Sequence, residues 1–131
     1  MIMKKCMILI SLLFGAQAMA QAQNPLAETE EGKVMITVFL KHNQEIGFDQ
    51  IMEKLNESDF WKEFPPESAT VVSWYTMMGI GQVVTLKIPG EKLRELNLSI
   101  EKNAWGAFFT EFYPTYDLWP VIQNIKKEQQ E

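Results

Sequence analysis

His42 is one of the few residues of this chain that could carry acid–base chemistry. It is the only histidine among 131 residues, and histidine is the side chain that ordinarily changes charge near neutral pH. It ends the segment 34–42, VMITVFLKH, whose β-branched and aromatic residues predict a strand. His42 is therefore a candidate general base, or a ligand contact at the mouth of a pocket. The alternative is an ordinary surface histidine at the end of a strand, next to Lys41 and Asn43.

Glu111 is the second candidate proton carrier. It lies within the aromatic segment 108–113, FFTEFY, inside a predicted strand at 106–113. A carboxyl group that is half-buried among aromatic rings is suited to acid–base catalysis. A charge in the middle of an edge strand also discourages pairing with other chains, and the sequence leaves both interpretations open.

Aromatic residues predict where a small ligand would bind. If the strand that ends at His42 and the strand 106–113 are antiparallel neighbours, the end of the first lies next to the start of the second. Aromatic walls with one polar group are typical of a small-molecule site. We therefore expect a ligand-binding site made of His42, Trp105, Phe108 and Phe112. The same rings can equally belong to the core or to a protein interface. Four threonines are candidates to add hydroxyl groups to one face of the sheet: Thr37, Thr76, Thr85 and Thr110. The alternative is the ordinary preference of threonine for strands.

Composition and charge argue against several classes of function. One cysteine and one histidine are too few for a zinc site or a disulfide framework, and the acidic residues form no calcium-binding loop. With 12 Lys and Arg against 17 Asp and Glu, the net charge is −5, so we expect no nucleic-acid partner. The glycines at 79–81 lack the strand-to-helix context of a phosphate loop. We expect no cofactor and no metal ion.

Residues 1–20 have the three parts of a secretory signal peptide. A pair of lysines is followed by an apolar run and then by small residues at alternate positions, which fit cleavage after Ala20 or Ala22. Cys6 precedes the apolar run, so it does not fit a lipoprotein anchor. We expect a periplasmic or secreted protein with no membrane span after signal cleavage. The alternative interpretation is a short buried helix.

The rest of the chain divides into a lead-in, one domain and a C-terminal segment. Residues 21–32 are polar and without periodicity, so we expect a flexible lead-in. The domain is expected to cover residues 33–119, and residues 120–131 to form a short helix or a charged tail. Within the domain, apolar periodicity and turn residues predict strands at 34–42, 70–78, 82–88 and 106–113, helices at 48–55 and 91–102, and a helical turn at 60–64.

The predicted order of elements is β-α-β-β-α-β, the pattern of a ferredoxin-like fold. Right-handed crossovers would place both helices on one face of a four-stranded antiparallel sheet, with strands in the order 4-1-3-2. In the strand 34–42, one alternate set is wholly aliphatic and should face the helices: Val34, Ile36, Val38 and Leu40. The opposite set is only partly polar, and too little chain remains to cover it. We therefore expect a homodimer whose sheets meet face to face.

On this element order, hairpin placement and two-sided apolar sheet, the chain resembles the dimeric α/β-barrel superfamily over roughly residues 34–113. This group includes muconolactone isomerase and antibiotic-biosynthesis-type monooxygenases. The resemblance implies an α+β ferredoxin-like fold and a barrel made by two copies. Members of the group use different residues for unrelated activities, so no catalytic residue is implied. The segments FWKEFPPE and AWGAFFTEFYPTYD are also similar to those of uncharacterised small exported bacterial proteins.

Three functions are consistent with the sequence. The first is an exported homodimeric module that binds a small apolar or aromatic ligand, or a partner protein. The second is a cofactor-independent isomerase or monooxygenase-like enzyme, with His42 and Glu111 as proton carriers. The third is a structural or stress-related accessory protein. The sequence has no recognisable nucleophile motif, metal constellation or nucleotide motif, which favours a binding or accessory module.

Overall fold

The computed structural model describes residues 32–131. In chain order these form β1 (Lys33–His42), α1 (Phe48–Glu57), α2 (Phe60–Glu63), β2 (Thr70–Met77), β3 (Gly81–Pro89), the short 3-10 helix η2 (Gly90–Lys92), α3 (Leu93–Asn103), β4 (Phe108–Thr115) and α4 (Trp119–Glu128). The four predicted strands are present, with β4 shifted by two residues toward the C-terminus. The expected signal peptide, and all of the expected lead-in except Gly32, lie outside the described residues.

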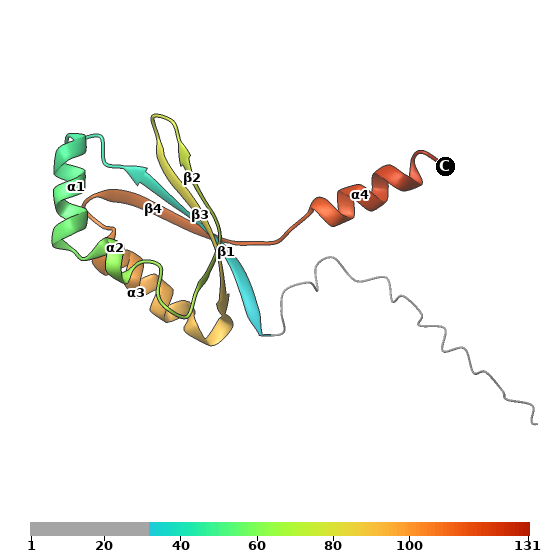
Figure 1. Ribbon diagram of the computed structural model, residues 1–131, viewed down its shortest axis with the longest axis horizontal. Helices are drawn as coiled ribbons and strands as arrows, with labels where there is room; N and C mark the ends of the chain where they lie inside the picture. The colour runs from blue at the N-terminus through green and yellow to red at the C-terminus, as the bar shows by residue number, and fades with distance from the viewer. Residues whose placement is uncertain (1–31) are drawn as a thin grey trace, which may run out of the picture.

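The four strands form one antiparallel sheet in the order β2-β3-β1-β4 (Figure 1). Read from the β4 edge, this is the order 4-1-3-2 that was expected. β1 pairs with β3 on one side and with β4 on the other, so it is a central strand. Gly81, the first residue of β3, has φ of +154° and lies against β1, where an added Cβ would collide with the carbonyl oxygen of Leu40. Only glycine fits this close approach of two backbones.

The protein belongs to the α+β class, and its sheet and helices are compatible with a ferredoxin-like fold. Helices α1, α2 and α3 lie on one side of the sheet, where the hydrophobic core is found (Figure 1). The buried strand residues alternate as the aliphatic pattern predicted: Ile36, Val38 and Leu40 on β1, and Val84, Leu86 and Ile88 on β3. The helices contribute Ile51, Leu55, Phe60, Leu96 and Ile100 to the same core. Each fully enclosed aliphatic side chain stabilises the fold by about 1.5–3 kcal/mol.

Phe60 is the aromatic centre of this core. Its side chain is fully buried, and its ring contacts four other rings: Trp61, Phe64, Trp74 and Phe108. These partners come from α2, from the residue after α2, from β2 and from β4. The ring therefore ties the short helix α2 to both edge strands of the sheet.

β2 departs from simple alternation. Its register with β3 shifts between Val71 and Ser73, so Val72 is the extra residue of a β-bulge. After the bulge, Trp74 pairs with the buried Val84 on the helix side, and Tyr75 points to the opposite side. Val71 and Val72 remain 44% and 50% exposed at this edge of the sheet.

α4 lies apart from the rest of the fold. It follows β4 after the three residues 116–118 and projects away from the sheet (Figure 1). None of its residues is buried, and no other element within residues 32–131 packs extensively against it. The ammonium group of Lys126 lies over the ring of Trp119, 5.5 Å from its centroid. None of the helices between residues 32 and 131 combines the length and the apolar character that a membrane span requires.

Candidate functional site

The sheet has a second face, opposite the helices, which we call the open face. The register places its side chains in four rows across β4, β1, β3 and β2: Thr115, Met35, Lys87 and Thr70; Tyr113, Thr37, Thr85 and Ser73; Glu111, Phe39, Val83 and Tyr75; and Phe109, Lys41, Gly81 and Met77. The helices α1 to α3 lie on the other side (Figure 1). Tyr75, Phe109 and Tyr113 are 68%, 53% and 52% exposed. The open face therefore carries three large aromatic side chains that the helices do not cover.

One row of the open face consists of hydroxyl groups. Thr37 is its centre, with its Oγ1 3.1 Å from Oγ1 of Thr85. The hydroxyl of Thr115, in the neighbouring row, donates to Thr37 Oγ1 at 2.8 Å. Thr37 can then donate its own hydrogen to Thr85, so the three groups form a short chain of hydrogen bonds. The middle of the open face therefore offers fixed polar atoms between aromatic side chains.

The expectation that four threonines share one face is only half right. Thr37 and Thr85 are direct neighbours on the open face. Thr110 lies opposite the buried Leu40 and therefore on the helix side, as does Thr76, which pairs with Gln82. The reason is that both alternate sets of β4 are aromatic, so their pattern does not reveal which set faces the helices.

The row next to the hydroxyl groups contains Phe39, Val83 and Tyr75 and ends in the carboxylate of Glu111. Phe39 lies between Glu111 and Val83, and its ring meets the edge of the Tyr113 ring at a centroid distance of 6.2 Å. Nζ of Lys41 lies 3.4 Å from Oε1 of Glu111, and both side chains are nearly half exposed. An exposed ion pair of this kind contributes at most about 1 kcal/mol. Both charges thus remain accessible to whatever covers the open face.

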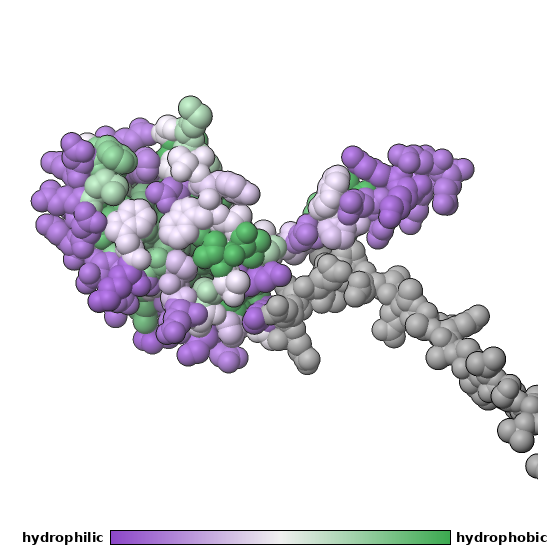
Figure 2. Space-filling view, viewed as in Figure 1, coloured by the Kyte–Doolittle hydropathy of each residue, from purple (hydrophilic) through white to green (hydrophobic). Residues whose placement is uncertain are grey.

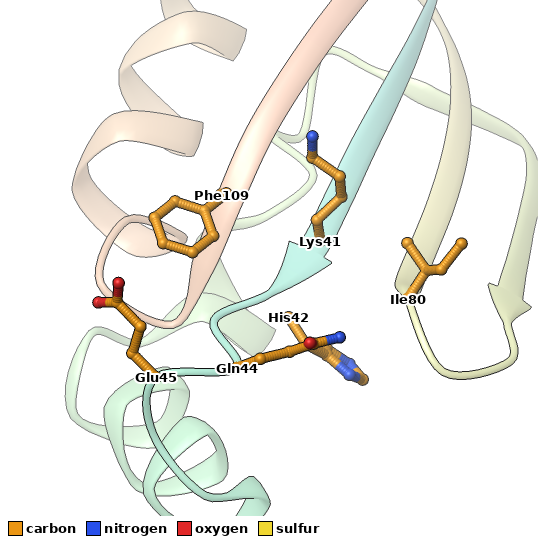
Figure 3. A pocket seen from close by; sticks show the side chains of 6 residues that line it. All are labelled: Lys41, His42, Gln44, Glu45, Ile80 and Phe109. Carbon is orange, nitrogen blue, oxygen red and sulfur yellow. The ribbon is translucent and has the colours of Figure 1, made fainter.

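Two shallow depressions flank Phe109, where β1 ends and β4 begins; we call them the rim depressions. The first has a volume of about 440 Å³ and is lined by Lys41, His42, Gln44, Glu45, Ile80 and Phe109 (Figure 3). The second has a volume of about 380 Å³ and is lined by Asn43, Trp105, Gly106, Phe108, Phe109 and Thr110. Phe109 lines both depressions and also belongs to the open face, so it joins the rim to that face.

His42 lies in an aromatic environment at this rim. Its imidazole stacks on the ring of Phe108, with centroids 5.8 Å apart and 19° between the planes, and meets the edge of Phe48 at 6.4 Å. Its backbone N–H donates to the carbonyl oxygen of Ile80 at 2.8 Å. The ring is only partly exposed, so it can offer a polar atom to a ligand from a position held by two phenyl groups.

The other residues expected in the ligand site are distributed along the same edge. Trp105 is 58% exposed, and its Nε1 donates to Oγ1 of Thr110 at 3.0 Å. Phe108 is 3% exposed and mainly a core residue, although it lines the second rim depression beside Trp105. Phe112 pairs with Val38, four residues or about 14 Å further along β4. His42, Trp105 and Phe108 therefore lie at one edge, and Phe112 lies away from it.

The two candidate proton carriers face different sides of the sheet. His42 pairs with Phe108, a core residue on the helix side. Glu111 is three positions further along β4 and lies on the open face beside Lys41. Side chains of a strand alternate between its two faces, so residues an odd number of positions apart lie on opposite faces. Glu111 therefore lies on the face opposite to Phe108 and His42. The two groups thus do not lie side by side on one face of the sheet.

Sequence reasoning did not include Phe109 among the residues of a ligand site. The available signal was the period of two along a strand, which places Phe109 on the same face of β4 as Glu111. The bulge at Val72 and the two aromatic sets of β4 obscured that signal. The pairing partners on β1 and β3 resolve it.

Residues 32–131 contain no group of three or more His, Cys, Asp or Glu side chains placed to hold a metal ion. No protein-family model matches the chain, and comparison with curated proteins and with solved structures gave no significant match. The function is therefore inferred from the geometry of the open face and its rim.

Proposed function

We propose that this protein is an exported homodimeric binding module, in which the open faces of two copies meet and enclose a small apolar or aromatic ligand. In this proposal the fold is ferredoxin-like and the dimer is an α/β barrel. The observation that supports it is the open face. Three helices cover one side of the sheet, while the other side presents Tyr75, Phe109 and Tyr113 to solvent.

The open face is suited to pairing with a copy of itself. A two-fold dimer brings the same surface of both subunits together, so that surface must be self-complementary. The open face carries an apolar row around Phe39 and, next to it, one positive and one negative group, Lys41 and Glu111. In a face-to-face dimer the rings and aliphatic side chains of the two apolar rows exclude water, while each copy keeps its own Lys41–Glu111 pair. Like-charged faces would repel instead.

The same face has the chemistry of a site for a small ligand. Aromatic and aliphatic side chains supply contact area, and a few fixed polar atoms supply orientation. On the open face the hydroxyl groups of Thr37 and Thr85 are those polar atoms, and Phe39 and Tyr113 are the neighbouring rings. We expect the ligand to carry at least one hydrogen-bonding oxygen or nitrogen on an otherwise apolar or aromatic skeleton.

The rim depressions would form the entrance to this chamber. Phe109 lies at the junction of the open face with both depressions. His42 flanks it on one side and Trp105 on the other. The ligand-binding role proposed for His42 and Trp105 is thus a role at the entrance, whereas the hydroxyl row orients the ligand inside.

Binding is favoured over catalysis because of where the titratable groups lie. An isomerase or monooxygenase-like reaction with His42 and Glu111 as proton carriers needs both groups on one substrate. They occupy opposite faces of the sheet, and Glu111 is already paired with Lys41. The alternative enzyme would therefore have to use one of them alone.

Light scattering on a sizing column tests the dimer with a matched pair of variants. Phe39→Asp places a charge at the centre of the open face, where burial without a partner is strongly unfavourable, so we expect a monomer. Phe48→Asp is the control, because Phe48 is 64% exposed on the helix side and an aspartate at a helix start is well tolerated. We expect this control to remain dimeric. A monomeric wild-type chain, or a dimer that survives Phe39→Asp, would overturn the proposal. Native mass spectrometry of the exported protein would show any retained ligand.

A further inference from the structure

We propose that α4 is an exchange arm: in the dimer, α4 of each copy packs on the partner's β2 edge, against Val71 and Val72. This inference rests on the proposed homodimer and adds to it a second contact surface. It accounts for two apolar surfaces that have no cover within residues 32–131, the stripe along α4 and the bulged edge of β2.

α4 is amphipathic. Its apolar side chains recur at helical spacing on one side, and they are Leu118, Trp119, Ile122 and Ile125. Leu118, Trp119 and Ile125 are each about half exposed. The opposite side is polar and carries Asn124 and Lys127. A helix with such a stripe is stable in water when the stripe packs against another surface. Trp119 is suited to anchor that contact because large aromatic residues contribute most to interface energy.

The β2 edge offers a surface of matching character. The bulge presents two consecutive valines at the outer strand, both about half exposed. Figure 2 shows hydrophobic residues gathered on this side of the molecule, while α1 and much of α4 are hydrophilic. A helix laid along this edge would cover the valines. It would also shield an unpaired strand edge, which proteins commonly protect.

The partner's β2 edge is easier for α4 to reach than its own. Thr115 ends β4 in the same row as Thr70, at the far edge of the sheet. Three strand spacings separate them, about 14 Å, and the four Cα–Cα steps from Thr115 to Trp119 span about 14 Å only when fully extended. α4 would therefore begin at its own β2 edge only with the linker stretched straight across the open face. In a face-to-face dimer with its two-fold axis along the strands, β4 of one copy lies against β2 of the other. The start of α4 then lies over the partner's Thr70, the residue that precedes the two valines of the β2 edge.

The area of the open face also favours a second contact. Strands of eight residues at about 3.4 Å per residue, with four strands about 4.8 Å apart, give a footprint of about 500 Å². A stable protein interface buries about 800 Å² on each partner. A helix about 15 Å long and about 10 Å wide would supply much of the difference.

Disulfide trapping between different chains tests the arm. Two single-cysteine variants, Ile122→Cys on a tagged chain and Val72→Cys on an untagged chain, are co-expressed with Cys6→Ser in both. We expect a disulfide-linked pair that contains one tagged and one untagged chain. Asn124→Cys is the matched control, since it lies on the polar side of the same helix, and it should cross-link far less. In a second measurement, Ile122→Glu should weaken the dimer roughly tenfold or more.

The outcomes separate this inference from the proposed function. If the wild type is a dimer but Ile122→Cys gives no cross-link between chains, the arm is refuted and the sheet-to-sheet dimer stands. The arm is equally refuted if the cysteines pair only when both are in one chain, because α4 then folds onto its own sheet. An Ile122→Glu variant with unchanged dimer affinity leads to the same conclusion. If the wild type is a monomer at all concentrations, the proposed function fails first, and the arm with it.

Discussion

Replacing Thr37 by valine tests the hydroxyl row at the centre of the open face. The two side chains have nearly the same shape, and valine is at least as favourable as threonine in a strand. The substitution removes one hydroxyl group that lies 3.1 Å from Thr85 Oγ1 and 2.8 Å from Thr115 Oγ1. Packing is therefore almost unchanged, and the loss of two hydrogen bonds is isolated.

The expected destabilisation follows from these two contacts. A hydrogen bond contributes about 0.5–1.5 kcal/mol net. Thr37 is only partly buried, so water can replace part of what is lost, and the added methyl group offsets a little more. We expect the free energy of unfolding to fall by about 1 kcal/mol, which corresponds to a decrease in Tm of about 4–8 °C for a domain of this size.

Urea unfolding and thermal melting at one fixed protein concentration would measure this change. Thr76→Val is the matched control, because Thr76 is exposed on the helix side of β2 and exposed substitutions usually change stability by less than about 0.5 kcal/mol. A double-mutant cycle with Thr115→Val should show that the two changes are not additive, since the residues share a hydrogen bond.

The result that would refute this reasoning is a Thr37→Val protein as stable as Thr76→Val. The hydroxyl groups would then interact with water rather than with one another, and the open face would lack fixed polar atoms. Additive effects in the cycle with Thr115 would point the same way. In either case the proposed orientation of a ligand by this row would lose its basis.

Three further predictions concern the ends, the core and the rim. N-terminal sequencing of the exported protein should show cleavage after Ala20 or Ala22, and a mature chain that still begins with Met1 would contradict this. Phe60→Ala should lower the free energy of unfolding by about 3–5 kcal/mol, because a fully buried ring leaves a cavity; a loss below about 1 kcal/mol in urea unfolding would disprove its central role. His42→Ala should weaken ligand binding in calorimetry with little loss of stability, and Trp105→Ala, whose ring is 58% exposed, should behave alike. Unchanged affinity in both would remove the rim from the site.

The helix-facing sides of β1 and β3 were predictable from the sequence. On β1 the aliphatic set contains Ile36, Val38 and Leu40, and these residues are buried under the helices. Alternation has a period of two, and one set was clearly more apolar than the other, so the face followed directly. β4 gave no such contrast, because its two alternate sets of residues, one containing Phe108 and the other Phe109, are both aromatic.

The candidate site was predictable only in its location. His42, Trp105 and Phe108 lie at the edge where β1 ends and β4 begins, since antiparallel neighbours bring those ends together. The separation of His42 from Glu111 onto opposite faces depends on the exact register, which one residue of slip would reverse. That register is set by hydrogen bonds between strands distant in the chain.

The sequence by itself determined the order of the elements, the aliphatic faces of the central strands and the expectation of export. Each of these follows from local periodicity, turn residues or the composition of one short segment. The tertiary structure decided the rest: the bulge at Val72, the row of hydroxyl groups around Thr37 and the projection of α4 away from the sheet. These features depend on which strands pair and in what register, and pairing energy is shared between residues far apart in the chain.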